Sequence, residues 1–317
     1  MSALYAALGA AAALGLGCAQ PPPPAAPART CARGFDASFV QLGRRELAFD
    51  QAAWRRALGL LRAVGVELVV VQFTGDETGP YDIRPLLAAA ASMRLKVFLG
   101  LDRDPTWPQA EAAARPAPPL GERRRIRALA ALCNGSLACA GWYLPQEIDD
   151  STWRGREEIL RAHLVASAAA LRRLTPGRPI AIAPFFTGAL EPEAHARFWD
   201  AILAEPSVDV VMLQDGVGSG RATAEMAAAY LAALQPIAAA RGVELWSVAE
   251  LFRQVHGAPV DQDPFAAVPM HPSTLRASLT AERMFARRLV AFSVLDYMDP
   301  ARGRAARTLY EDYTRCP

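Results

Sequence analysis

The sequence predicts a single (β/α)8 barrel, and three observations lead to that fold. From about residue 35 onward, short apolar segments alternate with amphipathic stretches, and the apolar segments number eight. Several of them are continuous apolar runs, as expected of parallel strands that are buried on both faces. The chain length of 317 residues also lies in the range of a one-domain barrel of this kind.

The elements follow in order along the chain. The expected strands cover residues 39–42, 68–73, 97–101, 140–144, 180–185, 208–213, 244–248 and 289–295. Asp50 is suited to cap the first helix, in which Trp54, Leu58 and Leu61 recur at helical spacing before Gly65 ends it. The other expected helices cover residues 83–93, 121–132, 155–174, 192–203, 223–241, 273–288 and 301–313.

A doubly wound open sheet is the alternative fold for such an alternation. It is disfavoured because residues 42–45, which follow the first strand, contain no glycine-rich phosphate loop. No second domain is indicated, so residues 35–317 are expected to form the barrel.

Composition limits the classes of function. With 52% hydrophobic and 21% charged residues, the chain can bury a sizeable core. Its net charge of +2 gives no reason to expect a nucleic-acid partner, which would require clustered basic residues. Arginine runs such as 123–125 fall on expected helices and are typical of solvated faces.

The N-terminal residues read as a processing segment. Residues 3–17 form an apolar run that ends at Cys18, and a proline- and alanine-rich tether follows. A cysteine at this place resembles a bacterial lipoprotein signal, which implies residues 1–18 as signal peptide, lipidation of Cys18 and a tether over 19–34. Plain secretion is the alternative. Either way we expect an exported, monomeric protein of the periplasm or cell envelope, with membrane contact only through a lipid anchor.

The remaining cysteines agree with export. Cys31 and Cys316 lie at the two ends of the folded region, and Cys133 and Cys139 flank an Asn-Gly turn signal. Two disulfides, Cys31–Cys316 and Cys133–Cys139, are the natural pairing in an oxidising compartment. A metal site is the weaker alternative, because neither the cysteines nor the four histidines have ligand spacing. We therefore expect no metal and no cofactor.

Polar residues that follow the strands should mark the site, because barrels of this kind place their active sites at the C-terminal ends of the strands. Carboxylates, amides and aromatic rings dominate there, which suits an uncharged, hydroxyl-rich ligand such as a carbohydrate. The expected substrate-binding residues are Gln41, Gln72, Asp102, Trp107, Gln146, Gln214, Asp215 and Tyr297.

Two glutamates are the catalytic candidates. Glu147 follows the fourth expected strand and Glu250 the seventh, so both belong to the same rim of the barrel. Hydrolysis of a glycosidic bond requires such a pair, one acid to protonate the leaving oxygen and one carboxylate to act at the anomeric carbon. The sequence therefore favours a retaining glycoside hydrolase with Glu147 as acid/base and Glu250 as nucleophile.

This arrangement resembles the superfamily of retaining glycosidases that carry glutamates on strands four and seven. There the acid/base follows an asparagine, whereas this chain has Gln146. The strings at residues 96–101, 141–148, 211–218 and 245–252 also resemble a family of bacterial exported barrels of unknown function that are described as glycoside-hydrolase-like. The resemblance covers about residues 35–300 and implies a barrel fold and a carbohydrate substrate.

Other interpretations stay open. Either glutamate could be a rim residue paired with an arginine such as Arg253, and Asp215 could simply cap a turn. A non-catalytic carbohydrate-binding or assembly lipoprotein on the same barrel is the second function. Metal-dependent hydrolysis or deacetylation is a third, disfavoured by the scarcity of histidine. The long segment 253–274 could form a lid or an ordered surface loop.

Overall fold

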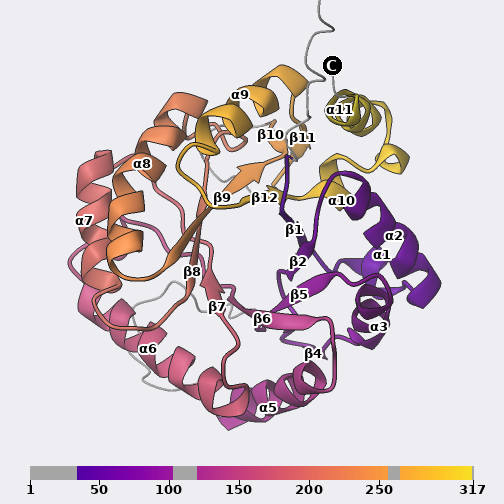
Figure 1. Cartoon of the computed structure of the whole chain (residues 1–317), viewed down its shortest axis with the longest axis horizontal. Helices are drawn as coiled ribbons and strands as arrows, with labels where there is room; N and C mark the ends of the chain where they lie inside the picture. Colours follow the sequence, from indigo (N-terminus) through magenta and orange to yellow (C-terminus); the bar gives the residue numbers. More distant parts are fainter. Residues whose placement is uncertain (1–33, 103–119, 256–264, 316–317) are drawn as a thin grey trace, which may run out of the picture. The chain divides into compact units, whose positions relative to one another are not determined.

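Eight parallel strands close into a barrel in the computed structural model, which describes residues 34–102, 120–255 and 265–315 (Figure 1). Around the ring the strands follow the order β1, β2, β5, β6, β7, β8, β9 and β12. Helices lie outside the ring and connect successive strands. The predicted (β/α)8 fold is confirmed, and β6 and β9 are its fourth and seventh strands.

The bounds of the elements are as follows. The barrel strands are β1 (Ala37–Val40), β2 (Leu68–Val71), β5 (Lys96–Gly100), β6 (Cys139–Leu144), β7 (Ile180–Ile182), β8 (Val210–Gln214), β9 (Glu244–Glu250) and β12 (Leu289–Phe292). The helices are α1 (Arg44–Leu47), α2 (Gln51–Ala63), α3 (Arg84–Ser92), α5 (Leu120–Asn134), α6 (Glu157–Leu174), α7 (Pro192–Ile202), α8 (Ala224–Ala240), α9 (Pro272–Glu282), α10 (Val294–Tyr297) and α11 (Arg304–Thr314), with a 3-10 turn at Pro300–Arg302.

Several boundaries differ from the prediction. The last strand ends at Phe292 instead of residue 295, because the Ser293 hydroxyl accepts a hydrogen bond from the Asp296 amide and begins α10. Helix α9 ends at Glu282, short of the expected residue 288. The expected cap of α2 is confirmed, since the Ala53 amide donates to Asp50 Oδ1 at 2.7 Å.

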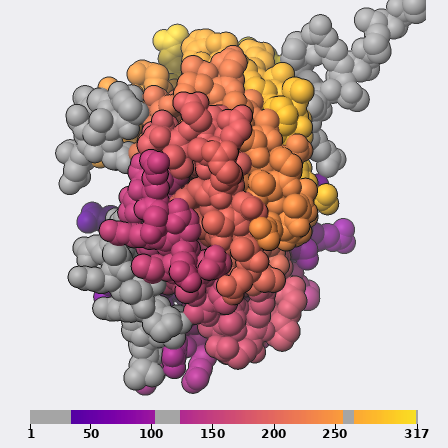
Figure 2. All heavy atoms as spheres, turned by 90° about the vertical axis from the view of Figure 1, so that its left-hand side faces the viewer, coloured from indigo at the N-terminus to yellow at the C-terminus, as the bar shows by residue number. Residues whose placement is uncertain are grey.

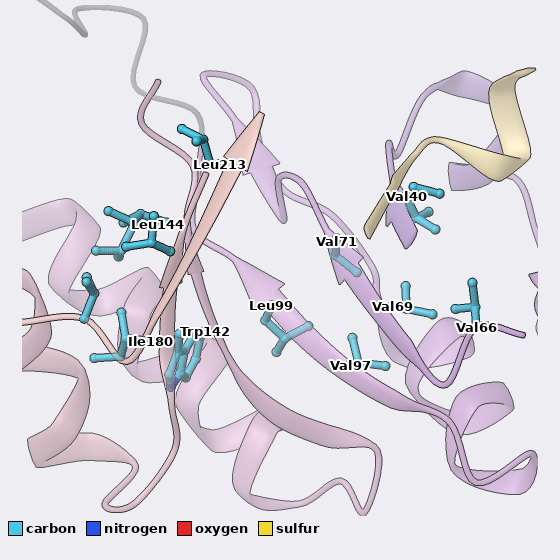
Figure 3. Packing of buried hydrophobic residues seen from close by; sticks show 14 of the residues in the cluster. Val40, Val66, Val69, Val71, Val97, Leu99, Trp142, Leu144, Ile180 and Leu213 are labelled. Carbon is cyan, nitrogen blue, oxygen red and sulfur yellow. The ribbon is translucent and has the colours of Figure 1, made fainter. Parts of the chain in front are cut away.

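Alternate residues of the strands fill two separate layers. One set, which includes Phe39, Val70 and Trp246, packs inside the barrel. The other set packs between the strands and the helices, and Figure 3 shows part of it, including Val71, Leu99 and Leu213. Burial on both faces explains why the strands are continuous apolar runs.

On the side of the molecule that Figure 2 shows, the atoms of α6, α7 and α8 form a continuous surface. Helix α7 buries Phe198, Trp199 and Ile202 against its neighbours. In the part of the chain that the structure describes, no helix combines the length and apolar character needed to cross a bilayer.

Two small antiparallel sheets stand outside the barrel order. The sheet of β3 (Gly75–Asp76) and β4 (Gly79–Pro80) follows β2. The sheet of β10 (Phe252–Gln254) and β11 (Ala267–Pro269) follows β9 and forms the two described ends of the long segment 253–274. The middle of that segment, including His256, lies outside the described residues, so the choice between a lid and a surface loop is not tested.

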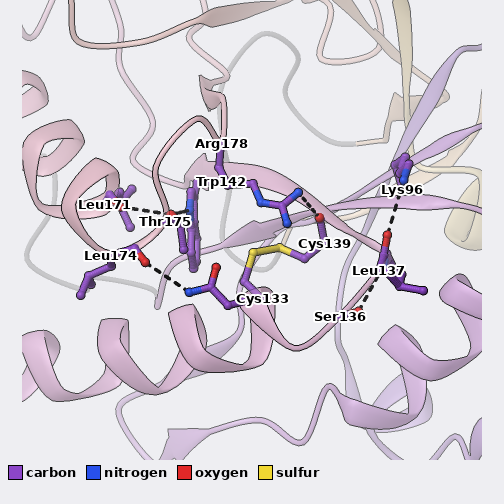
Figure 4. The surroundings of a disulfide bond; sticks show 12 residues. Lys96, Cys133, Ser136, Leu137, Cys139, Trp142, Leu171, Leu174, Thr175 and Arg178 are labelled. Carbon is purple, nitrogen blue, oxygen red and sulfur yellow. Dashed lines mark hydrogen bonds between the residues drawn. A yellow bond between two sulfur atoms is a disulfide. The ribbon is translucent and has the colours of Figure 1, made fainter.

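The predicted disulfide between Cys133 and Cys139 is confirmed. It joins the end of α5 to the first residue of β6, at the end of the barrel opposite the predicted site (Figure 4). Arg178 donates to the Cys139 carbonyl oxygen at 2.6 Å, which ties the same corner to the start of β7. Cys18, Cys31 and Cys316 lie outside the described residues, so their predicted roles stay predictions.

Removing this disulfide should cost stability without changing the fold. A bridge with a sequence separation of 6 reduces the entropy of the unfolded chain, and this reduction stabilises the folded protein by about 2 kcal/mol. We expect the double variant Cys133→Ala, Cys139→Ala to lose about that much free energy of unfolding in urea titrations. Equal stability of the variant and the oxidised protein would contradict the expectation.

Candidate active site

The C-terminal rim of the barrel brings the predicted polar residues to one end of the strands. Gln41 and Gln72, which follow β1 and β2, are joined there by a hydrogen bond of 2.6 Å between their side-chain amides. The Gln214 amide at the end of β8 donates to the Ala183 carbonyl oxygen at 2.8 Å. Trp107 lies outside the described residues, so its expected role in substrate binding stays a prediction.

Glu250 is the last residue of β9 and is buried, with 5% of its surface exposed. It follows the inward-facing Val248 by two residues, so its side chain belongs to the mouth of the barrel. The Ser219 amide donates to Glu250 Oε2 at 2.7 Å. Burial raises the pKa of Glu250, although the Ser219 amide and the charge of Arg221 act in the opposite direction.

The loop after β8 holds Glu250 closely. Gly216 adopts a positive φ of 66°, which glycine tolerates, and turns the chain back toward β9. At Gly218 a Cβ atom would lie 2.3 Å from the Phe252 carbonyl oxygen and 2.8 Å from the Glu250 Cβ. Only glycine fits there, which gives the Asp-Gly-Val-Gly string a physical role.

Arg253 is not the ion-pair partner of Glu250 that the sequence analysis considered. Its side chain is exposed on β10, and no ion pair joins it to Glu250 in the described part of the chain. Arg221 is the arginine that acts on Glu250, because its charge lowers the pKa of that carboxyl group. The guanidinium carbon of Arg221 stands 4.7 Å from the centre of the Phe185 ring, a cation–π contact.

Glu147 lies three residues beyond the end of β6 and is exposed at the rim. Its charge acts on Tyr143, a buried residue of the barrel interior whose pKa is raised by burial and then by Glu147. One oxygen of the neighbouring Gln146, Oε1, is buried without a hydrogen-bond partner among the described residues. Such an oxygen is available to a hydroxyl group of a ligand.

The loop that carries Glu147 is anchored by a buried hydrogen bond between an aspartate and a histidine. Asp150 Oδ2 lies 2.9 Å from His195 Nδ1, and both side chains are 0% exposed. The Thr187 amide and hydroxyl both donate to Asp150 Oδ1, at 3.0 and 2.7 Å. Burial would raise the pKa of Asp150, but the hydrogen bonds with His195 and Thr187 outweigh it and hold the pKa below the ordinary value.

Asp102, Asp215 and Tyr297 lie at or near the rim in different surroundings. Asp102 forms an ion pair of 2.8 Å with Arg125. Asp215 is 2% exposed and accepts from the Val217 amide at 3.0 Å, the turn-capping contact considered in the sequence. Burial, together with the charges of Asp296 and Glu250, raises the pKa of Tyr297 to about 12. The phenol of Tyr297 is therefore close enough to Glu250 to be influenced by its charge.

Three residues important to the site do not stand out in the sequence: Ser219, His195 and Glu282. Ser219 acts through its backbone amide, which no side-chain pattern reveals. Glu282 is buried in α9, seven residues after the buried Leu275, so both lie on the same face of the helix. An acidic residue on this apolar face was the available signal in the sequence. In the described residues no three His, Cys, Asp or Glu side chains form a group that could hold a metal.

Comparisons with known proteins agree on family and fold. The profile of the family described as "Domain of unknown function (DUF4434)" matches residues 35–303. An uncharacterized protein of Escherichia coli strain K12, YbcH, is 31% identical in an alignment of 283 residues that covers 82% of this chain and 88% of the relative.

Solved structures of glycoside hydrolases share the barrel. A candidate alpha-L-fucosidase from Bacteroides thetaiotaomicron superposes with a TM-score of 0.72 at 17% identity, over 88% of this chain and 94% of that one. A beta-1,3-glucanosyltransferase from Rhizomucor miehei has a TM-score of 0.51 at 14% identity, over 86% and 91%. An intracellular xylanase from Thermoanaerobacterium saccharolyticum has a TM-score of 0.51 at 13% identity, over 82% and 85%. At these identities the likeness concerns the fold.

Proposed function

This chain belongs to the family described as a domain of unknown function (DUF4434), and on that premise we propose that it is a retaining glycoside hydrolase of oligo- or polysaccharides. The observation that carries the proposal is the burial of Glu250 at the end of β9, with one carboxylate oxygen held by the Ser219 amide. Glu147 stands at the end of β6 on the same rim. The glycoside hydrolases among the structural neighbours support the same class of reaction.

In the proposed reaction Glu250 attacks the anomeric carbon while Glu147 protonates the departing glycosidic oxygen. A covalent glycosyl ester forms on Glu250 and the glycosidic C–O bond breaks. Glu147, now a carboxylate, takes a proton from water, and the resulting attack on the anomeric carbon releases Glu250. Two inversions leave the configuration of the sugar unchanged.

The surroundings of the two glutamates suit these separate roles. Burial raises the pKa of Glu250, and the Ser219 amide and the charge of Arg221 oppose that rise, which favours the ionised form that a nucleophile requires. Glu147 is exposed, so a bound sugar would have to cover it to favour the protonated form that an acid catalyst requires. Gln146 Oε1 and the amides of Gln41 and Gln72 are the proposed contacts to sugar hydroxyls.

Export belongs to the same proposal. The apolar segment before Cys18 favours a secreted or lipid-anchored protein of the cell envelope. The Cys133–Cys139 disulfide supports this placement, since such bonds persist in oxidising compartments.

A hydrolysis screen tests the proposal. The protein is incubated with aryl α- and β-glycosides and with purified polysaccharides, and sugar release and the anomeric configuration of the first product are followed by ¹H NMR. We expect at least one substrate to be cleaved with retention of configuration. Saccharide binding without cleavage, undiminished in Glu147→Gln and Glu250→Gln variants, would instead support the non-catalytic carbohydrate-binding protein.

A further inference from the structure

Two further carboxyl groups are buried close to Glu250, on the other side of the sheet. Asp215 follows β8 and is 2% exposed, and Glu282 ends α9 and is 0% exposed. Asp215 comes two residues after the outward-facing Leu213, so it lies in the layer between strands and helices, where Glu282 enters from α9. The proposed hydrolysis makes no direct use of either group.

The hydrogen bonds of these carboxyls leave one oxygen of each unaccounted for. The Ser247 hydroxyl donates to Glu282 Oε2 at 2.7 Å, and the Val217 amide donates to Asp215 Oδ1 at 3.0 Å. Asp215 Oδ2 and Glu282 Oε1 are buried with no donor from the described residues. The two carboxyl groups nevertheless act on each other: the charge of Glu282 raises the pKa of Asp215, and hydrogen bonding with Asp215 lowers the pKa of Glu282. Ionised carboxylates only accept hydrogen bonds, so this contact requires a proton.

We propose that Asp215 and Glu282 share a proton and that the pair is a positioning device for Glu250, an inference that rests on the proposed function of Glu250 as nucleophile. One proton between Asp215 Oδ2 and Glu282 Oε1 satisfies both orphaned oxygens at once. It also removes one of three negative charges from a small buried volume, which would otherwise be costly.

Two paths lead from the pair to Glu250. Asp215 Oδ1 accepts from the Glu250 amide at 3.4 Å, a long contact that holds the end of β9. The same oxygen accepts from the Val217 amide and so fixes the loop in which the Ser219 amide binds Glu250 Oε2 at 2.7 Å. Rotation of Asp215 would therefore break its contact with the Glu250 amide and loosen the loop whose Ser219 amide binds the Glu250 carboxylate.

The ionisable groups around the pair determine its pH dependence. Glu250 of β9 acts on both members, while Arg221 and Tyr297 act through Glu250. Burial and the charges of Glu282 and Glu250 raise the pKa of Asp215 well above its usual range. Burial raises the pKa of Glu282 from 4.5 to about 7, against the hydrogen bonds from Ser247 and Asp215.

The sign of the effect on stability follows from these directions. A carboxyl whose pKa is raised by folding binds its proton more tightly in the folded protein than in the unfolded chain. Its contribution to stability is complete below the unfolded pKa of 4.5 and is lost as the pH rises through about 7. The melting temperature should therefore fall across this range.

The first test is the melting temperature as a function of pH for the full chain and its Glu282→Gln variant. Glutamine keeps a donor for Asp215 and an acceptor for Ser247 but cannot lose a proton. We expect the wild-type melting temperature to fall by roughly 5 °C or more between pH 5 and pH 8, and the variant to lose most of that slope. Glu193→Gln, at an exposed position of α7, is the matched control and should keep the wild-type slope.

The second test measures positioning by hydrogen exchange and kinetics. Glu282→Leu should speed amide exchange in the peptide covering residues 215–220, whereas Glu282→Gln should not. With a cleaved substrate, Glu282→Leu should lower kcat by about 10- to 100-fold with little change in KM, and Glu282→Gln should restore it at pH 6.

An unchanged pH slope in Glu282→Gln would overturn the shared proton, and equal exchange in both Glu282 variants would overturn the positioning role. If Glu282→Leu does not fold, the comparison of Glu282→Gln with the wild type still decides the shared proton. Neither the melting curves nor the exchange experiment needs a substrate. A protein that cleaves nothing but shows both effects would refute the proposed hydrolysis and leave the pair intact.

Discussion

Replacing Glu250 with glutamine should abolish turnover of any cleaved glycoside. We expect kcat to fall by roughly 10⁴-fold or more, which is the scale of loss when an enzyme loses its nucleophile. The physical reason is that an amide cannot form the glycosyl ester, while its shape keeps the Ser219 hydrogen bond to an oxygen at the same place. Initial rates over a range of substrate concentrations give kcat and KM separately, and KM should change little.

The matched control for this variant is Glu77→Gln. Glu77 is an exposed glutamate in the turn between β3 and β4, so the same chemical change there should leave kcat unaltered. Because the pKa of Glu250 is raised by burial, its neutral replacement should not lower the melting temperature at acidic pH. Retained activity in Glu250→Gln, or unfolding of that variant alone, would assign Glu250 a structural role.

Replacing Asp150 with alanine should give the largest loss of stability. The substitution leaves His195 buried without its hydrogen-bond partner, and each buried polar group that loses its partner typically costs about 1–3 kcal/mol. The Thr187 amide and hydroxyl lose their acceptor as well. Urea unfolding at pH 7 measures the change, and the loop that carries Glu147 should become more accessible to proteases.

Asp200→Ala is the control for Asp150→Ala. Asp200 forms an ion pair of 2.6 Å with Arg241, but both side chains are partly exposed, so its loss should cost no more than about 1 kcal/mol. The pKa of Asp150 is lowered in the folded protein, so its contribution is present above the ordinary value of 3.8 and is lost as the pH falls further. Equal losses in the two variants would contradict the account of the buried pair.

The barrel could be predicted from the sequence because its strands are buried on both faces. Continuous apolar runs such as Leu68–Val71 lack the polar positions of a surface helix or a half-exposed strand. Turns and caps such as Asp50 separate these runs from the helices. The end of the last strand was missed because Val294 and Leu295 are apolar in a helix as they would be in a strand. A local contact, the Ser293 cap, decides between the two.

The placement of Glu147 and Glu250 at one rim of the barrel could be predicted, but the residues that contact them could not. Strand order alone brings Glu147 and Glu250 to one rim. The roles of Ser219, His195 and Glu282 depend on contacts between elements 31 to 45 residues apart in sequence, which no local pattern encodes. Asp215 illustrates both sides: its place after β8 was expected, whereas its burial beside Glu282 follows from the packing of α9 on β9.

The most direct test of the central claim is covalent trapping of the nucleophile. The protein is treated with a panel of 2-deoxy-2-fluoro glycosyl fluorides of different sugars, in which the fluorine slows breakdown of the glycosyl ester, and the labelled peptide is identified by mass spectrometry. The proposed mechanism predicts one fluorosugar per chain, attached to Glu250, and none in the Glu250→Gln variant. Label on another carboxylate, or no label from any sugar of a class that the protein hydrolyses, would contradict it.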